Sequence, residues 1–168
     1  MKNIKYIQIC KENQDLYNKI LPQWVDYFNN LYWETEDEKP TDDEIIGDLN
    51  RRINIQENRA NMHFELFFDN DMLIGFSNFA IDTGGISGLI EKGYGTVMEY
   101  YIAPEFRRKG YGKIFYKHIE ETLKNDGTQN IYLTPDPSTG EPFWVAMGFK
   151  DSGKVDPDNN YPIYIKSI

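Results

Sequence analysis

The sequence has little cysteine and histidine, the residues that form disulfides and supply many metal sites. It holds one cysteine, Cys10, and two histidines in 168 residues. A single cysteine forms no internal disulfide, which fits a reducing cytoplasm. Cys10 lies near the end of a first predicted strand, where we read it as a small buried hydrophobe rather than a nucleophile. His63 and His118 fall on separate predicted elements without ligand spacing, so we expect no metal.

Membrane spans and export signals are missing from the sequence as well. No stretch approaches the roughly 18 uninterrupted apolar residues of a membrane helix, and residues 1–5 lack an apolar signal core. The content of 40% hydrophobic and 15% aromatic residues is too high for a disordered chain. A length of 168 residues is typical of one domain. We therefore expect a single cytoplasmic domain over residues 1–168, with no membrane partner.

Positive charge is scarce overall but concentrated in one segment. With 18 Lys and Arg against 27 Asp and Glu, the formal net charge is −9, which argues against a nucleic-acid partner because phosphate-backbone affinity comes mainly from cations. Residues 105–117 carry a charge of +4, which leaves −13 on the remainder; the five cations are Arg107, Arg108, Lys109, Lys113 and Lys117. A cationic segment on an acidic protein predicts a small anionic ligand.

Periodicity in the first half predicts one strand, two helices and a hairpin. A strand near residues 4–9 precedes an amphipathic helix over residues 14–33, which Pro22 is expected to kink or divide. Thr41 and Glu44 form a capping box that starts the second helix. Two aromatic and aliphatic runs, residues 62–68 and 72–81, then predict a β-hairpin.

The second half predicts strands that alternate with helices. A glycine-rich stretch, residues 83–95, is either a mobile substrate flap or a plain connection, and we favour the connection. A strand over residues 96–103 stops at Pro104 and is followed by a helix that Gly127 ends. Further elements follow, and their ranges are 131–134 for a strand, 141–147 for a short helix, and 149 with 161–165 for closing strands. The expected fold is a mixed α/β sheet with helices on both faces.

The turn that follows the fourth predicted strand has the composition of an anion site. The first turn of a helix directs backbone N–H groups toward an anion, and Gly110 and Gly112 keep side chains out of the way. The P-loop pattern fails because Ile114 follows Gly112-Lys113 where Ser or Thr belongs. The dinucleotide fingerprint also fails, since Phe115 stands where its third glycine belongs.

Two motifs instead resemble the GNAT superfamily of N-acetyltransferases. Its motif A, Arg/Gln-x-x-Gly-x-Gly/Ala after a strand that ends in aliphatic-x-Pro, is similar to Ile102-Ala103-Pro104-Glu105-Phe106-Arg107-Arg108-Lys109-Gly110-Tyr111-Gly112. The family's Phe-Tyr-x-x-x-Gly-Phe signature resembles Phe143-Trp144-Val145-Ala146-Met147-Gly148-Phe149. The predicted order of elements, β-α-α-β-β-β-α-β-α-β-β, also resembles that family over essentially the whole chain.

The resemblance implies a fold and a cofactor. It implies a mostly antiparallel sheet in which two parallel strands splay apart, with acetyl-CoA as acyl donor in the gap. The backbone of Tyr100 and Ile102 would hold the pantetheine, and the backbone of residues 108–113 the pyrophosphate. The implied cofactor-binding set is Tyr100, Ile102, Arg107, Arg108, Lys109, Gly110, Tyr111, Gly112 and Lys113.

The family's reaction is direct attack of an amine on the thioester. A backbone N–H near Tyr100 or Ile102 would stabilise the oxyanion. Many members place a tyrosine as general acid where this chain has Trp144, and an indole donates no proton at a useful pKa. A neighbouring tyrosine or water takes that role, or the thiol leaves unaided. Glu99 is the candidate base, and its alternative interpretation is a solvent-facing strand residue. Tyr101 is a second catalytic candidate, and its alternative interpretation is a core residue.

The acceptor is predicted only as a class, a primary amine of a small molecule or peptide. The acidic residues Glu34, Glu36, Asp37 and Glu38 either attract a cationic amine or form a solvated loop. Trp24, Tyr32 and Trp33 line the acceptor cleft or belong to the helical core. A catalytically silent acyl-CoA-binding or sensing domain and a binding module without cofactor are the alternatives. The chain is expected to be a monomer or homodimer.

Overall fold

The computed structural model describes residues 2–31, 39–86, 88–137 and 139–168, and divides the chain into two units. The first unit comprises Met1–Ser77 and Tyr100–Lys109, and the second comprises Asn78–Glu99 and Gly110–Ile168. The boundaries fall inside two strands and between Lys109 and Gly110. The predictions about Tyr32, Trp33 and the acidic run concern residues 32–38, which lie outside the described part of the chain.

The order of elements along the chain is the predicted one. In sequence, the elements are β1 (Ile4–Gln8), α1 (Gln14–Leu31), α2 (Asp42–Asn58), β2 (Met62–Asp69), β3 (Met72–Ile81), β4 (Gly95–Ile102), the 3₁₀ turn η1 (Pro104–Phe106), α3 (Tyr111–Asn125), β5 (Asn130–Leu133), α4 (Glu141–Ala146), β6 (Lys150–Val155) and β7 (Pro162–Ser167). Pro22 lies inside α1, which continues on both sides of it. Of the two expected effects, a kink or a division, the division is excluded.

The strands form a mixed sheet. Over the described residues seven strands are hydrogen-bonded in the order β1-β2-β3-β4-β5-β7-β6. The pairs β1–β2, β5–β7 and β6–β7 are antiparallel, whereas β4 and β5 are parallel. Their register covers only Gly95↔Ile131 and Thr96↔Tyr132, although β4 continues to Ile102. A parallel pair that separates after two residues confirms the predicted mixed sheet with a splayed strand pair.

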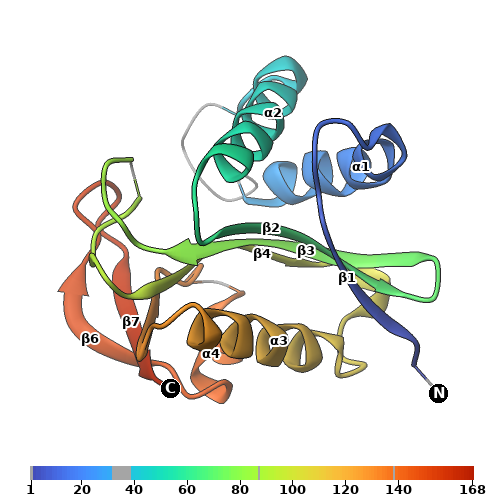
Figure 1. Cartoon of the computed structure of the whole chain (residues 1–168). Coiled ribbons are helices and arrows are strands. Elements are labelled where there is room, and N and C mark those ends of the chain that lie inside the picture. The colour runs from blue at the N-terminus through green and yellow to red at the C-terminus, as the bar shows by residue number, and fades with distance from the viewer. Residues whose placement is uncertain (1, 32–38, 87, 138) are drawn as a thin grey trace. The chain divides into compact units, whose positions relative to one another are not determined.

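The interior of the first unit is built on Trp24. This residue of α1 is fully buried, and its ring lies 5.0 to 5.5 Å from the rings of Phe28, Phe64 and Phe76. Its indole N–H donates to the carbonyl of Ile45 in α2 at 3.1 Å, and both helices lie on the same side of β2 (Figure 1). Burial of one such side chain contributes roughly 1.5–3 kcal/mol. Trp24 is therefore a core residue, the second of its two predicted roles.

The start of α2 shows the predicted capping box. The Glu44 N–H donates to the Thr41 hydroxyl at 3.3 Å, and the Thr41 N–H donates to the Glu44 carboxylate at 2.7 Å. The Thr41 hydrogen bonds lower the pKa of Glu44. The box satisfies N–H groups that a helix start otherwise leaves without partners, so it fixes where α2 begins.

The second unit has a separate aromatic interior. Tyr116 of α3 packs edge-on against Trp144 and Phe149, with ring centroids 5.5 and 5.6 Å away. The helix α3 ends at Asn125, and Gly127 follows in a left-handed conformation, φ 103°. Glycine adopts this conformation without the penalty that a Cβ brings. The predicted glycine stop is confirmed.

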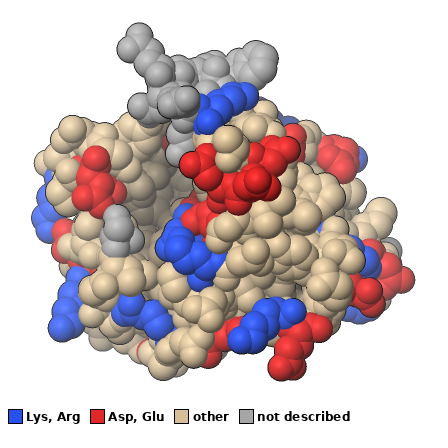
Figure 2. Space-filling view, turned by 90° about the horizontal axis from the view of Figure 1, so that it is seen from above, with Lys and Arg blue, Asp and Glu red and all other residues tan. Residues whose placement is uncertain are grey.

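Both signs of charge occur on the surface. Figure 2 shows basic and acidic side chains on the face that it views. Among the described residues, no helix combines the length and apolar character that crossing a membrane requires.

Candidate functional site

The end of β4 presents its backbone in a defined direction. The Ala103 N–H donates to the carbonyl of Ile74 in β3 at 2.9 Å, and the Tyr101 carbonyl also faces β3, because a Cβ built on Gly75 would lie 2.0 Å from its oxygen. Backbone groups of successive strand residues point to opposite edges. Ile102 lies between these two residues, so its N–H and C=O point away from β3, toward the edge where a ligand is predicted.

Tyr101, the second catalytic candidate, is a core residue with an engaged hydroxyl. Its side chain is 4% exposed and stacks on Phe76 with centroids 5.1 Å apart. The hydroxyl donates to Asp26 Oδ2 of α1 at 2.6 Å. Burial raises the pKa of Tyr101 well above its usual range, and the hydrogen bond to Asp26 adds to this effect. Tyr101 is therefore a weaker acid than an ordinary tyrosine, and its O–H is engaged in the hydrogen bond to Asp26.

Glu99, the candidate base, lies on β4 two residues before Tyr101 and is half-buried. Partial burial is compatible with a residue that contacts both protein and a ligand. Its assignment as the base stays a prediction.

The turn after β4 is held by Arg107. Its Nε–H donates to the Ile102 carbonyl at 2.7 Å, and its guanidinium lies over the Tyr101 ring, 5.6 Å from the centroid. Lys109 lies over Phe106, and its carbonyl accepts from the Lys2 ammonium at 2.9 Å. The charged side chains of residues 107–109 are exposed. They can meet an anion from solvent.

In the second unit, Gly110 precedes the first turn of α3. It has φ 83° and ψ −3°, and a Cβ at this position would have nothing within 4 Å. The Ile114 N–H donates to the Gly110 carbonyl at 3.2 Å, so the helix begins there. Lys113 is exposed, Gly112 is half-buried and the Tyr111 side chain is buried at 8% exposure. Because the Tyr111 side chain is buried, this residue can meet a ligand only through its backbone.

Trp144, at the position where many family members have tyrosine, belongs to the interior. It is 6% exposed in α4, and its ring meets those of Tyr116, Phe143 and Phe149 edge-on. The apolar bulk of an indole suits this packing. The geometry explains the tryptophan by packing and assigns it no proton transfer.

Sequence reasoning missed the residue that organises the glycine-rich connection. Asp82 is 1% exposed, and its carboxylate accepts from the N–H groups of Gly84 and Glu91 and from the Tyr132 hydroxyl, at 2.7, 2.8 and 2.8 Å. The Tyr132 hydroxyl in turn accepts from the Ile90 N–H at 3.0 Å. The described part of residues 83–95, which omits residue 87, is thus folded around a buried carboxylate. This favours an ordered connection over a mobile flap.

Two sequence signals could have indicated Asp82 and also Gly75, the β3 residue that lies against β4. An aspartate that precedes glycines by two positions is typical of a turn in which the side chain accepts from the backbone, as Asp82 does with Gly84. A lone glycine inside a strand indicates close backbone approach, as Gly75 shows.

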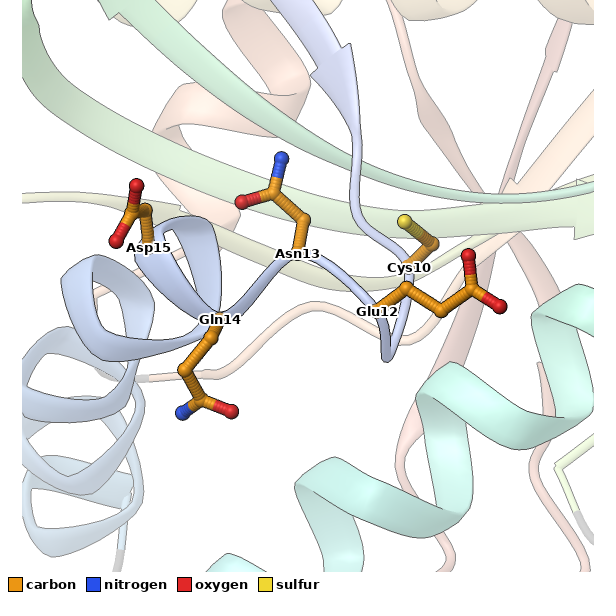
Figure 3. A pocket seen from close by; sticks show the side chains of 5 residues that line it. All are labelled: Cys10, Glu12, Asn13, Gln14 and Asp15. Atoms are coloured by element: carbon orange, nitrogen blue, oxygen red, sulfur yellow. The ribbon is translucent and has the colours of Figure 1, made fainter.

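One hollow in the first unit lies away from these residues in the sequence. It measures about 420 Å³ and is lined by Cys10, Glu12, Asn13, Gln14 and Asp15, at the start of α1 (Figure 3). Cys10 is half-buried rather than buried, because it lies at the rim of this hollow. Two carboxylates make the hollow a poor anion site. No group of residues suited to holding a metal ion occurs in the described part of the chain.

Comparison with solved structures shows the same fold in known acetyltransferases. An acetyltransferase from Thermus thermophilus superposes with a TM-score of 0.71 at 16% identity over 100% of both chains. The PaiA N-acetyltransferase from Thermoplasma acidophilum, solved with coenzyme A, gives 0.71 at 20% identity over 99% of each chain. An aminoglycoside N-acetyltransferase, also solved with coenzyme A, gives 0.62 at 16% identity over 92% of this chain and 93% of its own.

Comparison with curated protein sequences finds no significant match. A family model does match, over residues 15–149, and its description is the acetyltransferase (GNAT) family. That stretch contains both motifs and runs from the start of α1 to the end of the Phe-x-x-x-x-Gly-Phe signature. This chain belongs to the GNAT acetyltransferase family.

Proposed function

We propose that the chain is an N-acetyltransferase that transfers an acetyl group from acetyl-CoA to a primary amine of a small molecule or peptide. The observation that carries the proposal lies within the second unit. There the parallel pairing of β4 and β5 stops after two residue pairs, and α3 begins behind the left-handed Gly110. A parallel strand pair that opens and a helix start with an accessible backbone are the two features at which the resemblance to the GNAT family expects the cofactor.

The start of α3 fits a pyrophosphate. Backbone N–H groups of a first helical turn and the helix dipole both favour negative charge, the dipole by about 0.3–1 kcal/mol. At Gly110 no side chain holds an anion away from the backbone, and the space that a Cβ would enter is open. Lys113 on the same turn is exposed. Arg108 and Lys109, directly before Gly110 in the chain, bring two further exposed cations.

The end of β4 fits the amide groups of a pantetheine. The Ile102 backbone is turned away from β3 by the Ala103–Ile74 hydrogen bond. An extended ligand can pair with a strand edge through main-chain hydrogen bonds. Tyr100 and Ile102 therefore remain the residues that we assign to the pantetheine and the acyl group.

Bound acetyl-CoA supplies the thioester carbonyl that the amine attacks; a C–N bond forms and the C–S bond breaks. In our proposal Glu99 accepts the amine proton, directly or through water. A backbone N–H of Tyr100 or Ile102 stabilises negative charge on the carbonyl oxygen, which is worth about 3–4 kcal/mol for one donor. Because the Tyr101 hydroxyl already donates to Asp26, the thiolate takes its proton from water, as a thiol with a pKa of about 8.5 permits.

Ligand-induced stabilisation tests cofactor binding. Acetyl-CoA at about 100 times its Kd should stabilise the fold by about 2.7 kcal/mol, a rise in Tm of roughly 5–11 °C at this chain length. Gly110→Val should abolish that rise. Gly127→Val is the matched control, because Gly127 has the same left-handed strain at the other end of α3, φ 103°; this variant should keep the full ligand-induced rise.

Turnover is tested separately by the release of free thiol with a panel of primary amines and peptides. Thiol release that depends on the amine supports the enzyme. Binding without thiol release across the panel would identify the silent acyl-CoA-binding domain instead. An unchanged Tm with acetyl-CoA, or an equal loss in both glycine variants, would contradict the proposed site.

A further inference from the structure

Arg107 is the first residue of the cationic motif, yet its main contacts are with β4. The Nε–H donates to the Ile102 carbonyl at 2.7 Å. The guanidinium carbon also lies over the Tyr101 ring, 5.6 Å from its centroid. Five residues separate Arg107 from Ile102, so these contacts close the turn that contains η1 against the strand before it.

Both contacts use the planar shape of a guanidinium together with its charge. The Nε–H lies in the plane of the group, so one side chain can donate to a carbonyl while its face covers a ring. Lysine has a tetrahedral ammonium on a flexible stem and cannot make both contacts in this way.

The ring under Arg107 is itself anchored. Tyr101 is stacked on Phe76 at 5.1 Å and meets the edge of Tyr27 at 5.8 Å. Its hydroxyl donates to Asp26 Oδ2 at 2.6 Å. Asp26 is an exposed residue of α1, far from the cationic motif in the sequence. A continuous series of contacts thus runs from Asp26 through Tyr101 to Arg107 within the first unit.

We infer that Arg107 is a positioning residue that holds the Ile102 carbonyl and the following turn for the cofactor, with Asp26 and Tyr101 as its support. The inference rests on the proposed function and revises the cofactor-binding role that the resemblance implies for Arg107. We assign the charge of the pyrophosphate to Arg108, Lys109 and Lys113. Arg107 is exposed as well, but its side chain is engaged with Ile102 and Tyr101. Arg107 sets the shape of the turn from which two of these side chains extend.

The test measures the Kd of acetyl-CoA by calorimetry at about 0.05 M and about 0.5 M salt, since salt screens attraction between exposed charges. The variants are Arg107→Lys, Lys113→Gln and Asp26→Asn, with Arg51→Lys as the matched control. Arg51 is an exposed arginine of α2 paired with Asp48, and its replacement should leave the Kd unchanged.

We expect Arg107→Lys to weaken acetyl-CoA binding about tenfold or more, although the charge is conserved. The factor by which the Kd rises from the low to the high salt concentration should be the same in this variant as in the wild type. Lys113→Gln should instead reduce the salt dependence. Asp26→Asn should weaken binding in the same direction as Arg107→Lys, and the effects of these two changes should not add in the double variant, because they interrupt one series of contacts.

Wild-type affinity in Arg107→Lys would overturn the inference, and so would strictly additive effects of Arg107→Lys and Asp26→Asn. In both cases the wild-type chain still binds acetyl-CoA and the proposed function stands. A wild-type chain that does not bind acetyl-CoA overturns the proposed function, and this inference with it.

Discussion

Replacing Tyr132 by phenylalanine removes one oxygen atom from the buried cluster around Asp82. The Tyr132 side chain is 2% exposed, and its hydroxyl donates to the Asp82 carboxylate at 2.8 Å while it accepts from the Ile90 N–H at 3.0 Å. The variant loses one hydrogen bond to a charged group and leaves one N–H without that acceptor. Together these changes should cost about 2–4 kcal/mol of unfolding free energy.

For a chain of this length, about 2–4 °C of Tm corresponds to 1 kcal/mol, so Tyr132→Phe should lower the Tm by roughly 5–15 °C. Scanning calorimetry measures the shift. The matched control is Tyr161→Phe, because the Tyr161 side chain is 38% exposed; it should change the Tm by no more than about 2 °C. Equal shifts in the two variants would refute the claim that the Tyr132 hydroxyl holds the connection.

The raised pKa of Tyr132 should also make the stability of the fold depend on pH. Burial raises the pKa of Tyr132 well above its usual range, and the hydrogen bond to Asp82 adds to the rise. The folded state therefore holds this proton more tightly than the unfolded state, whose tyrosines have a pKa of about 10. The resulting stability is complete below about pH 10 and is lost as the pH rises further. Unfolding scans between about pH 9 and 11 should show a shallower decline in Tyr132→Phe than in the wild type.

Two further predictions concern β3 and β4. Gly75→Ala should destabilise the fold and weaken acetyl-CoA binding, because the added Cβ would lie 2.0 Å from the Tyr101 carbonyl oxygen; calorimetry measures both, and wild-type values would contradict the close approach of the two strands. Glu99→Gln should lower kcat about 100-fold or more while the Kd of acetyl-CoA stays unchanged. Its control is Glu121→Gln on the exposed face of α3, and equal rates in the two variants would exclude Glu99 as the base.

The features that sequence reasoning predicted correctly depend on neighbours in the chain. The capping box joins Thr41 to a residue three positions later, and Gly127, just after the end of α3, donates its N–H to the Lys124 carbonyl of that helix. Motif A also lies where its pattern placed it, between β4 and α3. Each rests on backbone geometry over a few residues, which residue type and spacing reveal.

The features that were predicted incompletely depend on surroundings that spacing does not encode. β6 has the sequence Lys-Asp-Ser-Gly-Lys-Val and is mostly exposed, so it carries no apolar alternation; it is a strand because it pairs with β7. Pro22 was expected to kink or divide α1, and the helix is not divided: it continues through Pro22 while Leu16, Ile20 and Trp24 are buried. Packing of this apolar face offsets the loss of one helical hydrogen bond.

The amino-acid sequence alone determined the family, the order of elements and the location of the turn proposed to bind an anion. It did not determine the roles of Asp82, Gly75 and Arg107. The role of Asp82 depends on a hydrogen bond from Tyr132, 50 positions away. Tyr101, which supports Arg107, donates to Asp26, 75 positions away. Such contacts are set by which strands and helices meet, and their energies depend on burial that only the folded chain creates. Local pattern thus specified the turn, and tertiary packing determined which of its residues are held and which face solvent.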